Sequence, residues 1–194
     1  DRKHLCFVIG DVSDKGVRAG LFMALTESQI KGSSSRRRTP SDVLIRANNY
    51  LCQENDSGMF CTLFYGILNT ETGEVQYANA GHTPPYIMDI NGKSEPIKTT
   101  GDMALGVMED IVFKTSSLKL NKNSSIYLFT DGVNEAMNDN QEEYSLDRLE
   151  SFLDSKTNAS VNNIINDSLK NVKLFVGNAP QSDDITVLVV KYLG

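Results

Sequence analysis

The sequence is poor in cysteine, and its three cysteines form no recognisable framework. Cys6, Cys52 and Cys61 are odd in number and include no C-x-x-C pair, so their spacing does not predict a disulfide scaffold. This usage indicates a reducing compartment, and we expect a cytoplasmic location.

Positive charge and long apolar stretches are also scarce. The chain has 19 Lys and Arg against 25 Asp and Glu, a formal net charge of −6, and a pI near 4.9. Such a balance argues against nucleic acid as a partner, because phosphate backbones are bound by basic surfaces. No run approaches the roughly 18 apolar residues of a membrane-spanning helix, and the opening DRKH lacks the apolar core of a signal peptide. We therefore expect no membrane segment in this chain, although a parent chain could still be membrane-associated.

Several catalytic signatures are absent as well. No cysteine is followed by arginine six positions later, which excludes the loop of cysteine-dependent phosphatases, and there is no G-x-S-x-G nucleophile elbow. The segment NGKS at 91–94 resembles the end of a phosphate-binding loop, but Ile87 stands where the first glycine of that loop belongs. Asn91-Gly92 is better interpreted as a hairpin turn.

The 194 residues suffice for one domain with a substantial core. Apolar periodicity and turn residues predict helices and strands in separate blocks, which is typical of an α+β fold with helices flanking antiparallel sheets. The expected helices cover 17–31, 41–54, 146–153 and 161–175. The expected strands cover 6–11, an antiparallel meander over 59–69, 74–81, 84–90 and 93–97, and then 111–120, 124–131 and 185–192.

Three short acidic signatures adjoin strand-like runs: CFVIGD at 6–11, IYLFTDG at 126–132 and DDITVLVV at 183–190. Asp11 and Asp131 follow their runs, whereas Asp183 and Asp184 precede theirs, so an antiparallel arrangement would gather them at one edge of a sheet. Clustered carboxylates repel one another unless a cation neutralises them, and oxygen ligands favour Mg²⁺ or Mn²⁺. The trio therefore predicts a hard-metal site, whereas each Asp taken alone is better explained as a solvated strand end.

Four ordered motifs resemble a known family. GDVSDKGVRAGLFMA, MFCTLFYGILNTETGEVQYANAGHTPPYI, LFTDGVNEA and QSDDITVLVV resemble the bacterial SpoIIE/RsbU branch of the PPM metal-dependent serine/threonine protein phosphatases, from about Leu5 to Val190. The resemblance implies an α-β-β-α sandwich, with two central antiparallel sheets flanked by helices. It also implies a site for two Mn²⁺ or Mg²⁺ ions at one end of the sandwich.

The resemblance assigns roles residue by residue. It implies that Asp11 touches both metals, that Val12 offers its backbone carbonyl, and that Asp131 and Asp183 complete one metal site. Asp184 is an additional metal candidate beside the ligand. The implied reaction is hydrolysis of phosphoserine or phosphothreonine by a metal-activated water.

The resemblance also implies partners. The implied substrate is a phosphorylated STAS-type, anti-anti-sigma-factor-like protein of bacterial partner switching, and the parent chain would carry an upstream sensor domain. A homodimer is left open.

Relatives carry a further metal-binding Asp just upstream of the first strand pair, and this chain begins at Asp1, after that position. We therefore expect residues 1–194 to be a single phosphatase domain, a C-terminal fragment of a longer signalling protein, with a weakened second metal site. The alternative function is a catalytically weak phosphatase-fold module that binds a regulatory partner.

Four further features have competing interpretations. His82 in NAGH could be a general acid, but a turn-ordering role is preferred. Asp14 could add charge near the metals, but a solvated turn residue is the preferred interpretation. Arg36–Arg38 could bind a phosphate or an acidic partner, but a solvated loop between helices is preferred. Gly132 predicts a sharp exit of the chain after Asp131.

Overall fold

The computed structural model describes residues 3–34, 38–55, 58–90, 92–99 and 103–194. Within these ranges the chain has four helices and two four-stranded antiparallel sheets. The chain divides into two compact units. Unit 1 comprises residues 1–82 and 99–119, and unit 2 comprises residues 83–98 and 120–194.

The sheet of unit 1 has the strand order β1-β2-β3-β6. Its strands are β1 (His4–Val12), β2 (Cys61–Asn69), β3 (Glu74–Ala80) and β6 (Ser116–Lys119). Strands β1, β2 and β3 are rich in aromatic and β-branched side chains, as the pleated surface of a sheet favours. Because successive side chains alternate between faces, Phe7, Phe64 and Tyr77 stack on one face. The other face of the sheet packs against the helices of unit 1.

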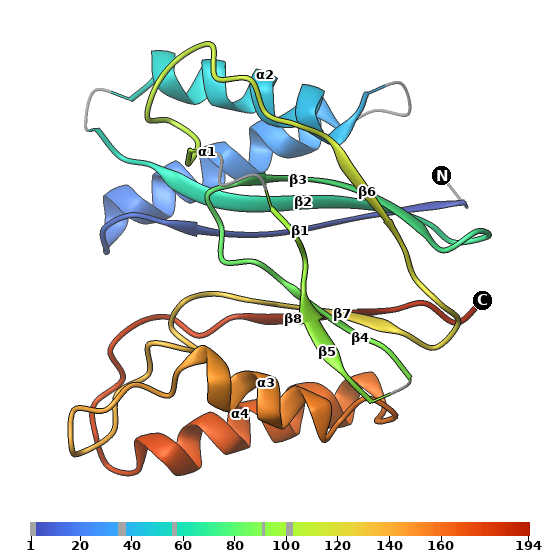
Figure 1. Cartoon of the computed structure of the whole chain (residues 1–194). Helices are drawn as coiled ribbons and strands as arrows, with labels where there is room; N and C mark the ends of the chain where they lie inside the picture. Colours follow the sequence, from blue (N-terminus) through green and yellow to red (C-terminus); the bar gives the residue numbers. More distant parts are fainter. Residues whose placement is uncertain (1–2, 35–37, 56–57, 91, 100–102) are drawn as a thin grey trace. The chain divides into compact units, whose positions relative to one another are not determined.

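Two helices, α1 (Val17–Ser33) and α2 (Pro40–Gln53), cover one face of this sheet (Figure 1). Helix α2 starts at a capping box: the Thr39 hydroxyl accepts a hydrogen bond from the Asp42 N–H, and the Asp42 carboxylate accepts one from the Thr39 N–H. Pro40 at the first helical turn lacks an N–H that would otherwise go unpaired. The core beneath the helices includes Val43, Leu44, Ala47, Leu51, Cys61, Leu63, Tyr65, Ala78 and Ala80.

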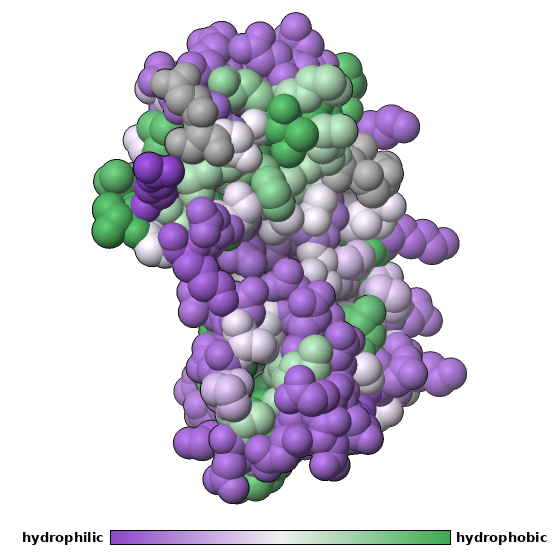
Figure 2. Space-filling view, turned by 90° about the vertical axis from the view of Figure 1, so that its left-hand side faces the viewer, coloured by the Kyte–Doolittle hydropathy of each residue, from purple (hydrophilic) through white to green (hydrophobic). Residues whose placement is uncertain are grey.

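Part of unit 1 presents apolar side chains to solvent. Figure 2 shows apolar surface on this unit, and its exposed large hydrophobic residues include Val17 and Leu21 of α1 and Phe60 just before β2. No helix in the described ranges is both long and apolar enough to span a bilayer.

The sheet of unit 2 has the order β5-β4-β7-β8, again antiparallel. Its strands are β4 (Tyr86–Met88), β5 (Ser94–Pro96), β7 (Ser125–Phe129) and β8 (Val187–Lys191), and its helices are α3 (Leu146–Asp154) and α4 (Val161–Val176). All five residues of β7 are buried, as in a strand covered on both faces. The core beneath α3 and α4 includes Tyr127, Phe129, Tyr144, Leu149, Leu153, Ile164, Val172 and Val189.

The α+β prediction, with antiparallel sheets flanked by helices, is confirmed, and the predicted helices agree with the observed ones to within about two residues. The single meander over 59–97 is wrong. Strands β2 and β3 pair in the sheet of unit 1, whereas β4 and β5 pair in the sheet of unit 2. The connection from the sheet of unit 1 to the sheet of unit 2 runs through His82–Pro85. There the turn after β3 and two consecutive prolines interrupt strand pairing.

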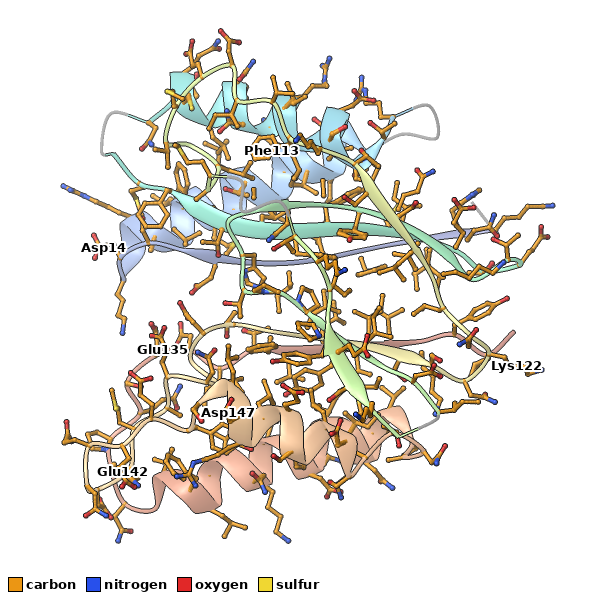
Figure 3. The ribbon with its side chains drawn as sticks, in the orientation of Figure 1. Asp14, Phe113, Lys122, Glu135, Glu142 and Asp147 are labelled. Carbon is orange, nitrogen blue, oxygen red and sulfur yellow. The ribbon has the colours of Figure 1, made fainter. Side chains whose placement is uncertain are left out.

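The predicted strand 111–120 is also shorter than expected, because residues 111–115 form a loop. This loop buries the Phe113 side chain in the core of unit 1 (Figure 3). It also contacts the start of α2, where the Thr115 hydroxyl accepts a hydrogen bond from the Ser41 N–H at 3.0 Å.

Candidate functional site

Asp131 and Asp183 lie at the same edge of the unit 2 sheet. Strands β7 and β8 are antiparallel neighbours, and Phe129 at the end of β7 pairs with Val187 at the start of β8. The segment that leaves β7 therefore runs beside the segment that enters β8. The sequence prediction of a shared edge is confirmed for these two carboxylates.

A pair of threonine contacts ties the two segments together. The Thr130 N–H donates to the Thr186 carbonyl at 3.1 Å, and the Thr186 N–H donates to the Thr130 hydroxyl oxygen at 2.9 Å. The Thr130 hydroxyl in turn donates to the Asp184 carbonyl at 2.9 Å. Thr130 is buried, so these bonds fix the backbone on both sides of the acidic edge with little access for competing water.

Gly132 allows the two segments to approach closely. A Cβ atom added at Gly132 would fall within 2.9 Å of the Asp184 carbonyl carbon and closer still to its oxygen, a separation that real side chains do not tolerate. The expected sharp exit of the chain therefore has a specific cause. The residue must lack a side chain because the Asp184 backbone packs directly against it.

Several carboxylates lie close together at the acidic edge. The Oδ1 atom of Asp131 is buried and has no hydrogen-bond partner among the described residues. Burial raises the pKa of the Glu135 carboxyl above its ordinary value. Further contributions to this raised pKa come from three neighbouring carboxylates, those of Asp131, Glu143 and Asp183. Glu135 lies in the loop between β7 and α3 (Figure 3).

This donor set fits a hard divalent cation. It consists of carboxylate oxygens, it includes a buried oxygen with an open coordination position, and its mutual repulsion would be relieved by positive charge. Within the described ranges, no cluster of three or more His, Cys, Asp or Glu side chains has ligating geometry by itself. The described residues of unit 2 therefore do not form a complete metal cage by themselves.

Asp11 and Val12 belong to unit 1 and end strand β1 there. The prediction that all the acidic residues share one sheet edge is wrong for Asp11, because β1 pairs with β2 in the sheet of unit 1. Asp11 is the register partner of Thr62, so both side chains lie on the same face of the sheet. The Thr62 hydroxyl lies 3.4 Å from the Asp11 carbonyl oxygen.

His82 is buried and contacts this strand pair. Its Nδ1 atom lies 3.0 Å from the Thr62 hydroxyl oxygen. The turn itself is held by Asn79, whose side-chain amide donates to the His82 carbonyl at 2.9 Å and accepts from the His82 N–H at 3.1 Å. The His82 backbone thus takes part in ordering the turn, while the imidazole supports the strand that carries Asp11.

The remaining sequence candidates have simple placements. Asp184 has an exposed side chain, and its carbonyl rather than its carboxylate makes the contacts to Thr130 and Gly132. Asp14 is exposed in a turn with a positive φ of 70° and accepts a hydrogen bond from the Lys15 N–H. Arg38 donates to the Ser33 carbonyl at 2.6 Å, whereas Arg36 and Arg37 lie outside the described residues.

Sequence reasoning missed three residues that shape the site: Thr62, Thr130 and Glu135. Glu135 stands four positions after Asp131 in the motif LFTDGVNEA, and its N–H donates to the Asp131 carbonyl at 2.8 Å. The spacing of four residues could have indicated that Glu135 lies near Asp131, since residues four positions apart in a helical turn face the same side of that turn. The two threonines gave no comparable signal, because their partners lie about 50 residues away in sequence.

Comparison with known proteins agrees with this picture. The family model described as stage II sporulation protein E (SpoIIE) matches residues 1–193. Protein IcfG of Synechocystis sp. is 32% identical over 216 residues, which cover 96% of this chain and 33% of IcfG. Phosphoserine phosphatase RsbU of Bacillus subtilis is 30% identical over 194 residues, which cover 98% of this chain and 56% of RsbU. The chain thus spans about a third to just over half of these relatives.

Solved structures share the fold. The RsbU and RsbW domains of Rv1364c from Mycobacterium tuberculosis superpose with a TM-score of 0.78 at 24% identity, covering 96% of this chain and 51% of that one. RsbX in complex with magnesium superposes with a TM-score of 0.71 at 19% identity, covering 98% of this chain and 82% of that one. By its sequence match along almost its whole length and by its fold, the chain belongs to the SpoIIE family, in the SpoIIE/RsbU-type branch of the PPM phosphatases.

Proposed function

We propose that this chain is a Mn²⁺- or Mg²⁺-dependent phosphoserine/phosphothreonine protein phosphatase. The observation that carries the proposal is the acidic edge of unit 2, where the buried Oδ1 of Asp131 has no hydrogen-bond partner among the described residues. Asp183 lies in the segment packed against Gly132. Clustered carboxylates repel one another and so lower the stability of the fold unless a bound cation neutralises them, and such clusters are found at functional sites.

Asp131 and Asp183 would hold the cation through carboxylate oxygens, and Asp11 with the Val12 carbonyl enters the proposal through the family resemblance. A bound cation supplies Lewis acidity, neutralising phosphoryl oxygens and lowering the pKa of water. Thr130 keeps the Asp131 and Asp183 segments together. Gly132 leaves room for the Asp184 backbone, so the carboxylates need little reorganisation on binding.

We infer that the substrate is a phosphorylated STAS-type protein in a bacterial partner-switching pathway. Two observations on relatives support this inference. RsbU and RsbP of Bacillus subtilis are both named phosphoserine phosphatases, and the Mycobacterium tuberculosis structure contains an RsbU domain together with an RsbW domain. By the same resemblance, an upstream sensor domain would regulate the reaction.

The deciding experiment measures phosphate release from a phosphoserine STAS-type protein across a Mn²⁺ titration. Asp131→Asn removes one charge from the acidic edge and should abolish release, while Asp14→Asn removes one from an exposed turn and should leave it unchanged. Mn²⁺ binding followed by electron paramagnetic resonance should weaken in Asp131→Asn only. Substrate binding without metal-dependent release would instead support the alternative of a catalytically weak, partner-binding module.

A further inference from the structure

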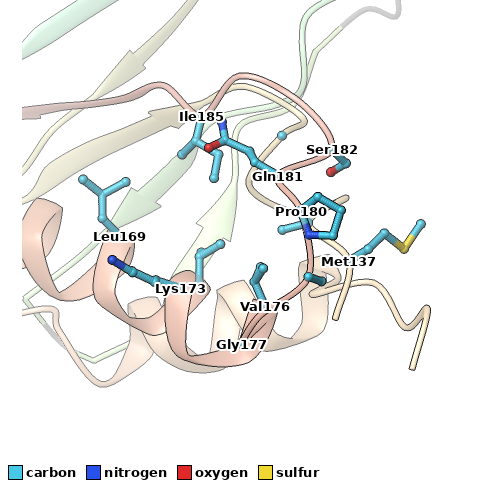
Figure 4. A pocket seen from close by; sticks show the side chains of 13 residues that line it. Met137, Leu169, Lys173, Val176, Gly177, Pro180, Gln181, Ser182 and Ile185 are labelled. Atoms are coloured by element: carbon cyan, nitrogen blue, oxygen red, sulfur yellow. The ribbon is translucent and has the colours of Figure 1, made fainter. Parts of the chain in front are cut away.

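A largely apolar cavity of about 440 Å³ lies beside the acidic edge of unit 2 (Figure 4). It is formed by the C-terminal half of α4, by Gly177, residues 179–182 and Ile185, and by the start of the loop that follows β7. Its apolar walls include Met137, Val172, Val176 and Pro180. The volume falls in the range of about 300–1,000 Å³ that is usual for ligand pockets.

The cavity begins one residue away from both expected metal ligands. Gly132 and Ser182 line it, and they are the chain neighbours of Asp131 and Asp183. Consecutive Cα atoms are about 3.8 Å apart. A side chain bound in the cavity and a phosphate bound at the acidic edge can therefore belong to residues that are one or two positions apart in the same peptide.

Among the described residues that line the cavity, one is charged: Lys173, which is exposed at the rim. The side chains of Lys173 and Leu169 project from the same stretch of α4 in Figure 4. Leu169 is 41% exposed, so the cavity opens to solvent along this side of the helix. A side chain that projects from another protein can therefore enter the cavity.

The geometry points to this cavity as the pocket that binds an apolar side chain next to the phosphoserine of the protein substrate, with Lys173 binding an acidic residue beside it. This inference rests on the proposed phosphatase function and adds a sequence preference to it. Three features carry it: apolar walls, a single cation at the rim, and adjacency to Asp131 and Asp183. An extended chain rises about 3.3 Å per residue, so the apolar residue would be adjacent to the phosphoserine or next but one.

The experiment compares hydrolysis of two substrates by the 194-residue chain. One is a phosphoserine peptide with leucine beside the phosphoserine and glutamate after the leucine, and the other is p-nitrophenyl phosphate, which has no group to enter the cavity. Ala179→Phe fills the cavity, and Lys173→Glu reverses the charge at its rim. Each should lower kcat/KM for the peptide by about tenfold relative to that for p-nitrophenyl phosphate.

Lys170→Glu is the matched control. It makes the same charge change on α4 at an exposed residue outside the cavity lining, and it should leave the ratio of the two kcat/KM values unchanged. A peptide with lysine in place of glutamate should recover activity with Lys173→Glu. Equal losses on both substrates, an effect of Lys170→Glu as large as that of Lys173→Glu, or failure of the charge-swapped peptide to recover activity would overturn the assignment.

Failure of the proposed function would look different. The unaltered chain would then hydrolyse neither substrate in the presence of Mn²⁺, and peptide binding would be measured by fluorescence anisotropy. Loss of binding in Ala179→Phe and Lys173→Glu but not in Lys170→Glu would still support the pocket. Binding that is unchanged in all three variants, or equally tight for the unphosphorylated peptide, would overturn it.

Discussion

The Nδ1 atom of His82 lies 3.0 Å from the hydroxyl oxygen of Thr62. Thr62 pairs in register with Asp11, whose carbonyl oxygen its hydroxyl also approaches. A hydroxyl has one proton to donate. If Thr62 donates it to the Asp11 carbonyl, His82 must donate from Nδ1, so the imidazole and the hydroxyl together support the end of β1.

We predict that His82→Ala lowers the free energy of unfolding by about 1–3 kcal/mol, because it removes the hydrogen bond to the half-buried Thr62 hydroxyl and leaves a gap where a buried side chain stood. The imidazole acts through Nδ1, whose position an asparagine amide can reproduce and a glutamine amide cannot. Urea unfolding should therefore rank His82→Asn above His82→Gln and His82→Ala. The Mn²⁺ concentration for half-maximal phosphate release should rise in the same order as stability falls. Equal behaviour of His82→Asn and His82→Gln would contradict the role of Nδ1.

Gly132→Ala tests the close approach of the two acidic segments. The new methyl group would overlap the Asp184 carbonyl, so the backbone must shift, at a cost of about 1–3 kcal/mol in unfolding free energy. Mn²⁺-dependent phosphate release should be lost with it. Gly20→Ala in α1 is the matched control, since a Cβ there meets nothing within 4 Å, and it should raise stability by up to about 1 kcal/mol. Full activity in Gly132→Ala would show that the contact is not needed.

Thr130→Val keeps the shape of the side chain but removes its hydroxyl, which donates to the Asp184 carbonyl and accepts from the Thr186 N–H. Two backbone groups then lose their partner, and we expect a loss of about 1–3 kcal/mol in unfolding free energy. Hydrogen exchange measured by NMR should show the Thr186 amide exchanging faster. Thr130→Ser retains the hydroxyl and should preserve slow exchange. Slow exchange in Thr130→Val would mean that other contacts protect this amide.

The pH dependence of stability has an identifiable contributor in unit 2. The Asp154 carboxylate accepts hydrogen bonds at 2.6 Å from both the N–H and the hydroxyl of Ser94, and these bonds lower the pKa of Asp154 below its ordinary value of 3.8. A carboxyl whose pKa is lower in the folded state stabilises the fold above that ordinary value. The stabilisation is lost as the pH falls through the folded-state pKa.

We therefore predict that Asp154→Asn destabilises the protein at neutral pH by up to about 1 kcal/mol, since the carboxylate is largely solvated. The difference from the unaltered chain should shrink as the pH falls below the ordinary value of 3.8 and through the lowered folded-state pKa. Ser94→Ala, which removes the hydroxyl donor and keeps the N–H donor, should show part of the effect. Thermal unfolding at several pH values measures both variants, and a difference that grows toward acid would reverse the assigned sign.

Some features follow from the sequence because they are local. The capping box of α2 needs only Thr39 and, three positions later, Asp42, and the helix limits follow apolar periodicity. The position of Asp131 directly after one strand-like run and of Asp183 just before another is also local, whereas their meeting at one edge depends on the pairing of β7 with β8. The family motifs sit in these same local segments, which is why the resemblance could be recognised before the fold was known.

Other features depended on the tertiary structure. A period of two marks a strand but does not name its partner, so the assignment of β1 to one sheet and of β7 and β8 to the other could not be derived from patterning. The contacts of Thr62 with His82 and of Thr130 with Asp184 join residues 20 and 54 positions apart. The raised pKa of Glu135 arises from burial and from nearby carboxylates. Pairing, burial and electrostatic coupling depend on distances in space, which the order of residues constrains but does not specify.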